Sequence, residues 1–215
     1  NKLKKYEDQG TFEFVISSIF EEYIYLFDNK KINSNFEEND FGKLTLINKA
    51  FQNCYLGNPT TDSYFESIIN FEEIGYSRYL FFYLNHLLDE NKFEKVENLL
   101  KNIDPLNSTL LVSQTRNWIN EKNYEKVRRI FSCKNQNDII AEILFVISNL
   151  YSSENYITES NFYFNLSNYF NPKFKYNLSL LVENYYNNGD YEKSEAILKN
   201  FNKEENIYYW YRIKK

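Results

Sequence analysis

The sequence has little of the residues on which several classes of protein depend. Its 215 residues include no methionine, two cysteines, three prolines and five glycines. Cys54 and Cys133 stand far apart with no CxxC pair, which argues against a zinc site and against a framework of disulfides. So few prolines and glycines leave little material for turn-dense sandwiches and barrels. An all-helical chain with short connections fits this composition better.

The single histidine, His86, limits the catalytic chemistry that the chain can support. A Ser–His or Cys–His site would have to be built around this one residue, which lies in the apolar stretch FYLNHLLDE. No HExxH, P-loop or GxGxxG pattern is present. Adjacent carboxylates such as Glu21 and Glu22 point about 100° apart on a helix and do not form a glycosidic acid–base pair. The sequence therefore predicts no enzyme activity, no catalytic residue, no metal site and no cofactor.

The charge balance of the chain disfavours a polyanionic partner. Acidic residues outnumber basic ones by 30 to 25, which gives a net charge of −5. A chain of this kind has no global positive field to attract nucleic acid, so nucleic-acid binding is disfavoured. Hydrophobic residues make up 43% and aromatic residues 19% of the chain, which excludes a disordered protein.

The most apolar run, TFEFVISSIFEEYIYLF, is interrupted by Glu13, Glu21 and Glu22. It falls short of the roughly 18 uncharged apolar residues of a membrane helix, so we expect no transmembrane segment. We interpret residues 11–28 as a buried or half-buried helix, followed by an acidic, asparagine-rich connector. The compartment stays open: cytoplasmic, or periplasmic if a signal peptide is missing from this chain.

A short motif recurs at a nearly constant spacing. The stretches NKFEKVENLL, KNYEKVRRIF and GDYEKSEAIL each place an aromatic residue, Glu and Lys before a small or branched residue, and ENYITESNFYF supplies a fourth copy. The equivalent small or branched residues are 31, 33 and 34 positions apart, and they are Val96, Val127, Ser160 and Ser194. A period of this length is typical of solenoids built from paired helices. The motif is then the turn between the two helices of a pair.

The last copy of the motif shows what each position would do in such a turn. Gly189 permits a tight turn, and Asp190 is placed to cap the second helix. We expect Tyr191 to pack across the corner and Ser194 to lie where the two helices cross.

Residues 144–172 form the clearest single unit. Large, large, small and aromatic residues follow along one helix, small, aromatic and small residues along a second, and a proline closes the unit; they are Leu144, Ile147, Ser148, Tyr151, Ser160, Phe164, Ser167 and Pro172. This pattern resembles the tetratricopeptide repeat (TPR), a 34-residue pair of helices, in a divergent bacterial form. Small residues at the crossing let the two backbones approach, while large ones fill the groove beside it.

The resemblance implies an all-α, right-handed superhelical solenoid of antiparallel helix pairs over residues 41–215. We expect the repeats to continue beyond the C-terminal end, because NIYYWYRIKK stops before a partner helix could cover it. Residues 1–40 form the N-terminal helix and acidic connector. Large residues at the crossing, Leu84 and Val182, leave a related family such as Sel1-like repeats as an alternative.

The resemblance also implies a function in protein–protein interaction. The first helices of the pairs would line a concave surface that accepts a peptide or a partner helix. The usual groove positions, projected onto this sequence, are Arg78, Asn85, Asp89, Arg116, Asn120, Asn149, Glu183, Tyr186 and Asn187. The leading interpretation is a non-catalytic scaffold with a protein or peptide partner. The alternative is a helical appendage of a larger enzyme that acts on peptidoglycan or glycans.

Overall fold

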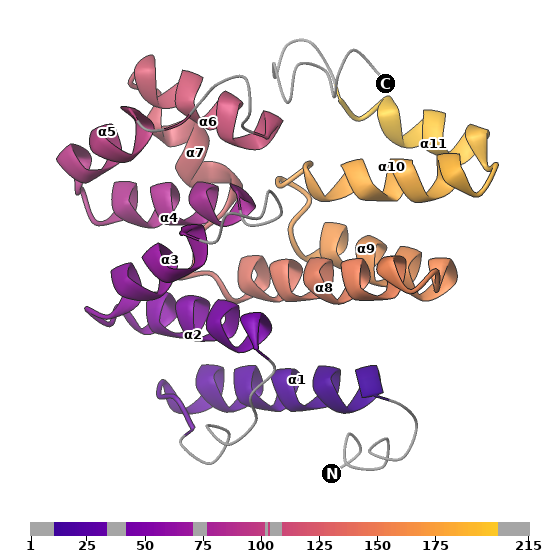
Figure 1. Ribbon diagram of the computed structural model, residues 1–215, viewed down its shortest axis with the longest axis horizontal. Coiled ribbons are helices and arrows are strands. Elements are labelled where there is room, and N and C mark those ends of the chain that lie inside the picture. Colours follow the sequence, from indigo (N-terminus) through magenta and orange to yellow (C-terminus); the bar gives the residue numbers. More distant parts are fainter. Residues whose placement is uncertain (1–10, 34–41, 71–76, 102, 104–108, 202–215) are drawn as a thin grey trace. The chain divides into compact units, whose positions relative to one another are not determined.

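The computed structural model describes residues 11–33, 42–70, 77–101, 103 and 109–201, and every regular element in these ranges is a helix (Figure 1). The chain divides into two compact units, residues 1–72 and 73–215. The all-α prediction is thereby confirmed for the described residues. Most of the predicted acidic connector and the whole segment NIYYWYRIKK lie outside them.

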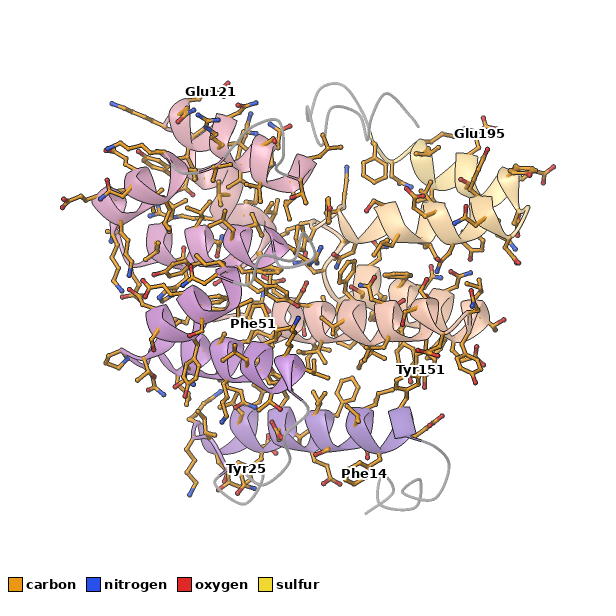
Figure 2. All side chains as sticks on the ribbon, in the orientation of Figure 1. Phe14, Tyr25, Phe51, Glu121, Tyr151 and Glu195 are labelled. Atoms are coloured by element: carbon orange, nitrogen blue, oxygen red, sulfur yellow. The ribbon has the colours of Figure 1, made fainter. Side chains whose placement is uncertain are left out.

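The described residues of the first unit form three helices, α1 (Thr11–Asn29), α2 (Lys43–Leu56) and α3 (Thr61–Ile69). The first of them confirms the helix predicted for residues 11–28. α2 packs against α3 through two buried rings, Phe51, which is labelled in Figure 2, and Phe65. Their ring centroids lie 5.9 Å apart. α1 packs against α2, where the hydroxyl of Tyr23 donates to the Asn48 side chain over 3.4 Å. Edge-on aromatic pairs of this kind stabilise a core beyond the area they bury.

The second unit is a series of helix pairs. Each pair consists of a helix, a three-residue turn and a second helix packed against the first. The pairs are α4 (Ser77–Asp89) with α5 (Phe93–Lys101), α6 (Leu110–Asn120) with α7 (Tyr124–Ile130), α8 (Gln136–Ser153) with α9 (Ile157–Phe170), and α10 (Asn177–Asn187) with α11 (Tyr191–Leu198). Helices of different pairs are also in contact. α4 of the first pair packs against α6 and α7 of the second, and α9 of the third pair packs against α10 of the fourth.

The turns within these pairs share one backbone geometry. The middle residue of each turn has a positive φ: 56° at Asn91, 57° at Lys122, 62° at Asn155 and 80° at Gly189. Only the last of the four is a glycine, for which this left-handed conformation carries no steric cost. The four positions repeat the spacing of the sequence motif, so the motif does mark the turns.

Hydrogen bonds explain why the four turns are alike. In the last turn, the N–H of Gly189 donates to the carbonyl of Tyr186 and the N–H of Asp190 to that of Tyr185, over 3.1 and 2.8 Å. The other three turns repeat both bonds. This Schellman arrangement satisfies carbonyls that the end of a helix would otherwise leave unpaired. The predicted cap is wrong, because the Asp190 side chain makes no capping bond and instead accepts from Lys193.

The small residues of the motif lie at the helix crossings, as predicted. Ser160 is fully buried, and its backbone carbonyl accepts a hydrogen bond from the hydroxyl of Ser148 on the facing helix. Ser194 is also buried, and its hydroxyl donates to the carbonyl of Val182 over 3.3 Å. A serine at the crossing therefore permits close approach and is hydrogen-bonded to the opposite backbone.

The start of α8 carries a carboxyl group that makes stability depend on pH. Asp138 Oδ2 accepts from the backbone N–H of Ser132 over 2.9 Å. Burial raises the pKa of Asp138 from 3.8 to about 6, against the opposing effects of that hydrogen bond and of Lys173. A raised carboxyl pKa means that its contribution to stability is complete below pH 3.8 and is lost as the pH rises through about 6.

Replacing Asp138 with asparagine is expected to remove this loss of stability. The amide keeps an oxygen for the Ser132 N–H but does not ionise. Between acidic and neutral pH, the free energy of unfolding of the variant should fall by about 1 kcal/mol less than that of the wild type, allowing for solvent screening. Urea unfolding across this pH range measures the difference. If the free energy of unfolding fell equally with pH in the two proteins, Asp138 would not be the source of the pH dependence.

Candidate partner-binding groove

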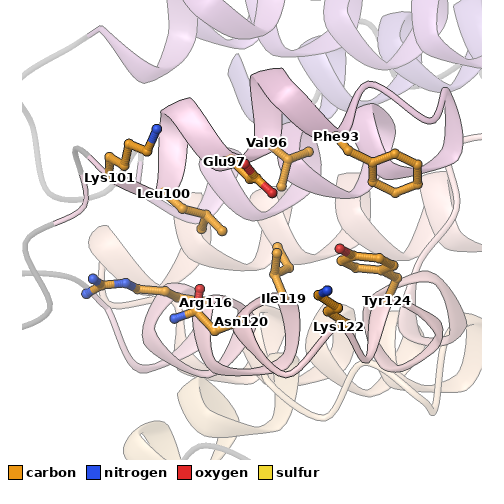
Figure 3. A pocket seen from close by; sticks show the side chains of 10 residues that line it. All are labelled: Phe93, Val96, Glu97, Leu100, Lys101, Arg116, Ile119, Asn120, Lys122 and Tyr124. Atoms are coloured by element: carbon orange, nitrogen blue, oxygen red, sulfur yellow. The ribbon is translucent and has the colours of Figure 1, made fainter.

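A groove of about 280 Å³ lies between α5 and the end of α6 with the turn that follows it (Figure 3). Val96 and Leu100 come from α5, and Ile119 comes from α6. The first two are four residues apart and therefore lie on one face of their helix. These three aliphatic side chains are largely buried and form the apolar part of the groove.

Two aromatic residues of the repeated motif stand at one end of the groove. Phe93 and Tyr124 each follow a left-handed turn by two residues, so that the repeat places them in equivalent positions on neighbouring pairs. Their ring centroids lie 5.3 Å apart, with the ring planes inclined by 34°. Phe93 remains 39% exposed, which leaves part of its ring open to a bound molecule.

Charged side chains surround the apolar part. Lys101 and Arg116 stand at the end opposite Phe93 and Tyr124, and Lys122 lies nearer the aromatic pair (Figure 3). Glu97 is the one carboxylate among the lining residues. The guanidinium of Arg116 lines the groove, and a guanidinium can bind a carboxylate through two parallel hydrogen bonds. Three cations against one anion make the groove locally positive on a chain that is acidic as a whole.

Two of the nine residues predicted to bind a partner lie in this groove. They are Arg116 and Asn120, four residues apart on α6. The side-chain amide of Asn120 offers both a donor and an acceptor to the backbone of a peptide. Asn120 is exposed, whereas Arg116 is half-buried.

Arg78 and Asn85 are in the core and not on a surface. Only 6% of Arg78 and 1% of Asn85 is exposed. The Arg78 guanidinium is paired with the Glu142 carboxylate of α8, and the Asn85 amide donates to the carbonyls of Val127 and Phe131 over 3.1 and 3.0 Å. α4 is covered by α5, α6 and α7, so these two positions cannot contact a partner.

The remaining five predicted residues do not line the groove. Asp89 is half-buried, 3.6 Å from the guanidinium of Arg128, and burial raises its pKa against the opposing effect of that arginine. Asn149 is half-buried and donates to the carbonyl of Phe145. On α10, the remaining three are half-buried or exposed, and they are Glu183, Tyr186 and Asn187. Tyr186 packs across the corner against Tyr191, as predicted for that turn, with ring centroids 5.3 Å apart.

His86 is buried in α4 and only 4% exposed. Sequence reasoning missed Phe93, Lys101, Lys122 and Tyr124 as lining residues of the groove. The signal for the two aromatics was present in the motif, where they occupy the same place in two successive copies. By itself the motif predicts packing at its own turn only, because the sequence does not show that adjacent turns stand side by side.

Comparison of the chain with protein-family models, curated proteins and solved structures finds no match. Among the residues that the structure describes, no helix combines the length and the apolar character needed to cross a bilayer.

Proposed function

We propose that this protein is a non-catalytic helical-repeat scaffold that binds a protein partner, with a superhelical arrangement of the TPR type. The four equivalent turns support the repeat, because they recur with the spacing of the motif and share the same pair of hydrogen bonds. Solenoids of helix pairs present extended surfaces between their repeats, and these surfaces typically bind peptides or partner helices.

The observation that carries the proposal is the groove between two neighbouring helix pairs. It combines an aliphatic floor, an aromatic pair with an exposed edge and a rim of charged and amide groups. Binding surfaces of this composition use the apolar part for affinity and the polar rim for orientation. Arg116 and Asn120 line the groove and also belong to the partner-binding surface that the sequence resemblance predicts.

A crosslinking experiment tests this function. A photoreactive amino acid at position 120 is expected to crosslink a defined partner in extracts of the source cells. Arg116→Glu is expected to reduce the yield about tenfold, because it reverses a charge at the end of the groove beside that position. Arg129→Glu, on the exposed side of α7, makes the same change outside the groove and should leave the yield unchanged. Equal yields from the two variants would contradict binding in the groove.

A further inference from the structure

We infer that the segment bound in this groove is an acidic peptide that carries an aromatic or aliphatic side chain beside its carboxylates. This inference rests on the proposed function and adds to it the chemistry of the partner. Three features of the groove support this inference: its positive charge, its apolar surface and the separation of the two along the groove.

The charge of the groove is opposite in sign to that of the chain. Lys101, Arg116 and Lys122 face the space, with Glu97 as the opposing charge, whereas the whole chain carries −5. Such a local positive site on an acidic protein attracts carboxylates and repels basic segments. An arginine also binds a carboxylate with two parallel hydrogen bonds, which gives direction as well as attraction.

The apolar surface of the groove favours a ligand that has an apolar side chain as well as negative charge. Beside the aliphatic floor, Phe93 is 39% exposed and Tyr124 is half-buried. A bound aromatic or aliphatic side chain would remove exposed apolar area from water. A volume of about 280 Å³ is at the small end for ligand sites, which suits a few side chains of a peptide.

The arrangement of the groove gives the ligand a direction. Lys101 and Arg116 stand at one end and the aromatic pair at the other, with Asn120 on the same side of the groove as Arg116 (Figure 3). A peptide would therefore place a carboxylate at the first end and its apolar side chain at the second. The Glu97 carboxylate in the wall disfavours a polyanion with evenly spaced phosphates, whereas a peptide can carry its charges at one end only.

Blocked synthetic peptides with a fluorescent label test this inference on the full chain. The first peptide carries two aspartates followed by leucine and tryptophan, the second has asparagines in place of the aspartates, and the third has lysines. We expect the acidic peptide to bind at least about tenfold more tightly than the amide peptide, and the lysine peptide to bind most weakly. Because the attraction is electrostatic, added salt should weaken binding of the acidic peptide.

Variants of the protein locate the two ends of the peptide. Arg116→Gln is expected to weaken the acidic peptide about threefold to tenfold and to leave the amide peptide unchanged, while Arg129→Gln changes neither. Phe93→Ala is expected to weaken both peptides, because it removes apolar contact. Circular dichroism of each variant checks that the helices are intact.

The outcomes separate this inference from the proposed function. Equal affinity for the acidic and amide peptides, or tighter binding of the lysine peptide, would overturn the acidic ligand. If in that case crosslinking at position 120 still depended on Arg116, the proposed function would remain supported, although the ligand would not be an acidic peptide. If no peptide bound and crosslinking was also insensitive to Arg116→Glu, both would be wrong.

Discussion

Replacing Glu142 with alanine is expected to lower the free energy of unfolding by about 3–5 kcal/mol, one of the largest effects of any single change in this chain. Glu142 is 1% exposed and accepts from Arg78 Nε over 2.9 Å and from Arg78 Nη2 over 2.5 Å. Arg78 Nη2 also donates to the Asn177 side chain over 2.6 Å, so three helices, α4, α8 and α10, meet at this guanidinium. Removing the carboxylate leaves a buried cation without its counter-charge.

Within the described part of the chain, the surroundings of Arg78 offer no other carboxylate in contact with its guanidinium, so removal of Glu142 is expected to be severe. Its guanidinium lies 3.7 Å from the ring centroid of Phe145 and 4.7 Å from that of Phe174, and its Nη1 has no hydrogen-bond partner among the described residues. Cation–π contacts attract the guanidinium but do not replace a carboxylate. Burial raises the pKa of Glu142, while Arg78 opposes that rise and favours the ionised form.

Urea unfolding measures this loss of stability, and two further variants serve as controls. The double variant Arg78→Met with Glu142→Leu removes both charges and should recover most of the stability, since buried pairs often contribute little net free energy compared with apolar residues. Glu195→Ala removes the carboxylate of an exposed ion pair with Lys199 and should change the free energy of unfolding by less than about 0.5 kcal/mol. A Glu142→Ala protein as stable as the Glu195→Ala protein would refute the assignment.

Replacing Phe174 with alanine is expected to cost about 3–5 kcal/mol by leaving a cavity in the core of the second unit. Phe174 is 1% exposed and lies between α9 and α10 in the chain. Its ring stacks on Phe81 of α4 at 5.2 Å and contacts Phe82 at 5.7 Å and Phe131 at 6.4 Å. The ring therefore joins the earlier helix pairs of this unit to the later ones.

The matched control for Phe174→Ala is Tyr169→Ala, on a side chain of α9 that is 79% exposed. The control should change the free energy of unfolding by less than about 0.5 kcal/mol. Because α4 and the later pairs share the aromatic core, we expect one cooperative urea transition of the second unit, shifted to lower concentration. A Phe174→Ala protein with an unchanged midpoint would show that this core does not join the pairs.

The helix pairs could be predicted from the sequence because their signals are local. A turn closes through hydrogen bonds between residues five apart or fewer, so that each copy of the motif in the sequence specifies its own turn. The small residues at Ser160 and Ser194 were informative for a similar reason, because a crossing near a short turn always brings the same positions together. Asp190 was the exception, since its carboxylate accepts a hydrogen bond from the Lys193 ammonium and does not form the predicted cap.

The candidate site was predicted less well because it depends on contacts between pairs. The projection onto a regular solenoid placed Arg78 and Asn85 on a surface, but α4 is surrounded by three other helices. Glu142 gave a weak signal as a lone acid in an apolar stretch, yet its partner Arg78 stands 64 residues earlier in the chain. Nothing in the intervening sequence identifies that partner.

The all-helical class, the pairing of successive helices and the positions of the turns between them follow from local signals in the sequence. Periodicity, turn hydrogen bonds and residue size act over a few positions and need no knowledge of the rest of the chain. The sequence does not show which polar residues are buried and which line a groove, nor that the tilted rings of Phe93 and Tyr124 meet; these features appear only in the folded chain. Burial depends on which helices lie beside one another, and that arrangement is the result of packing the whole unit.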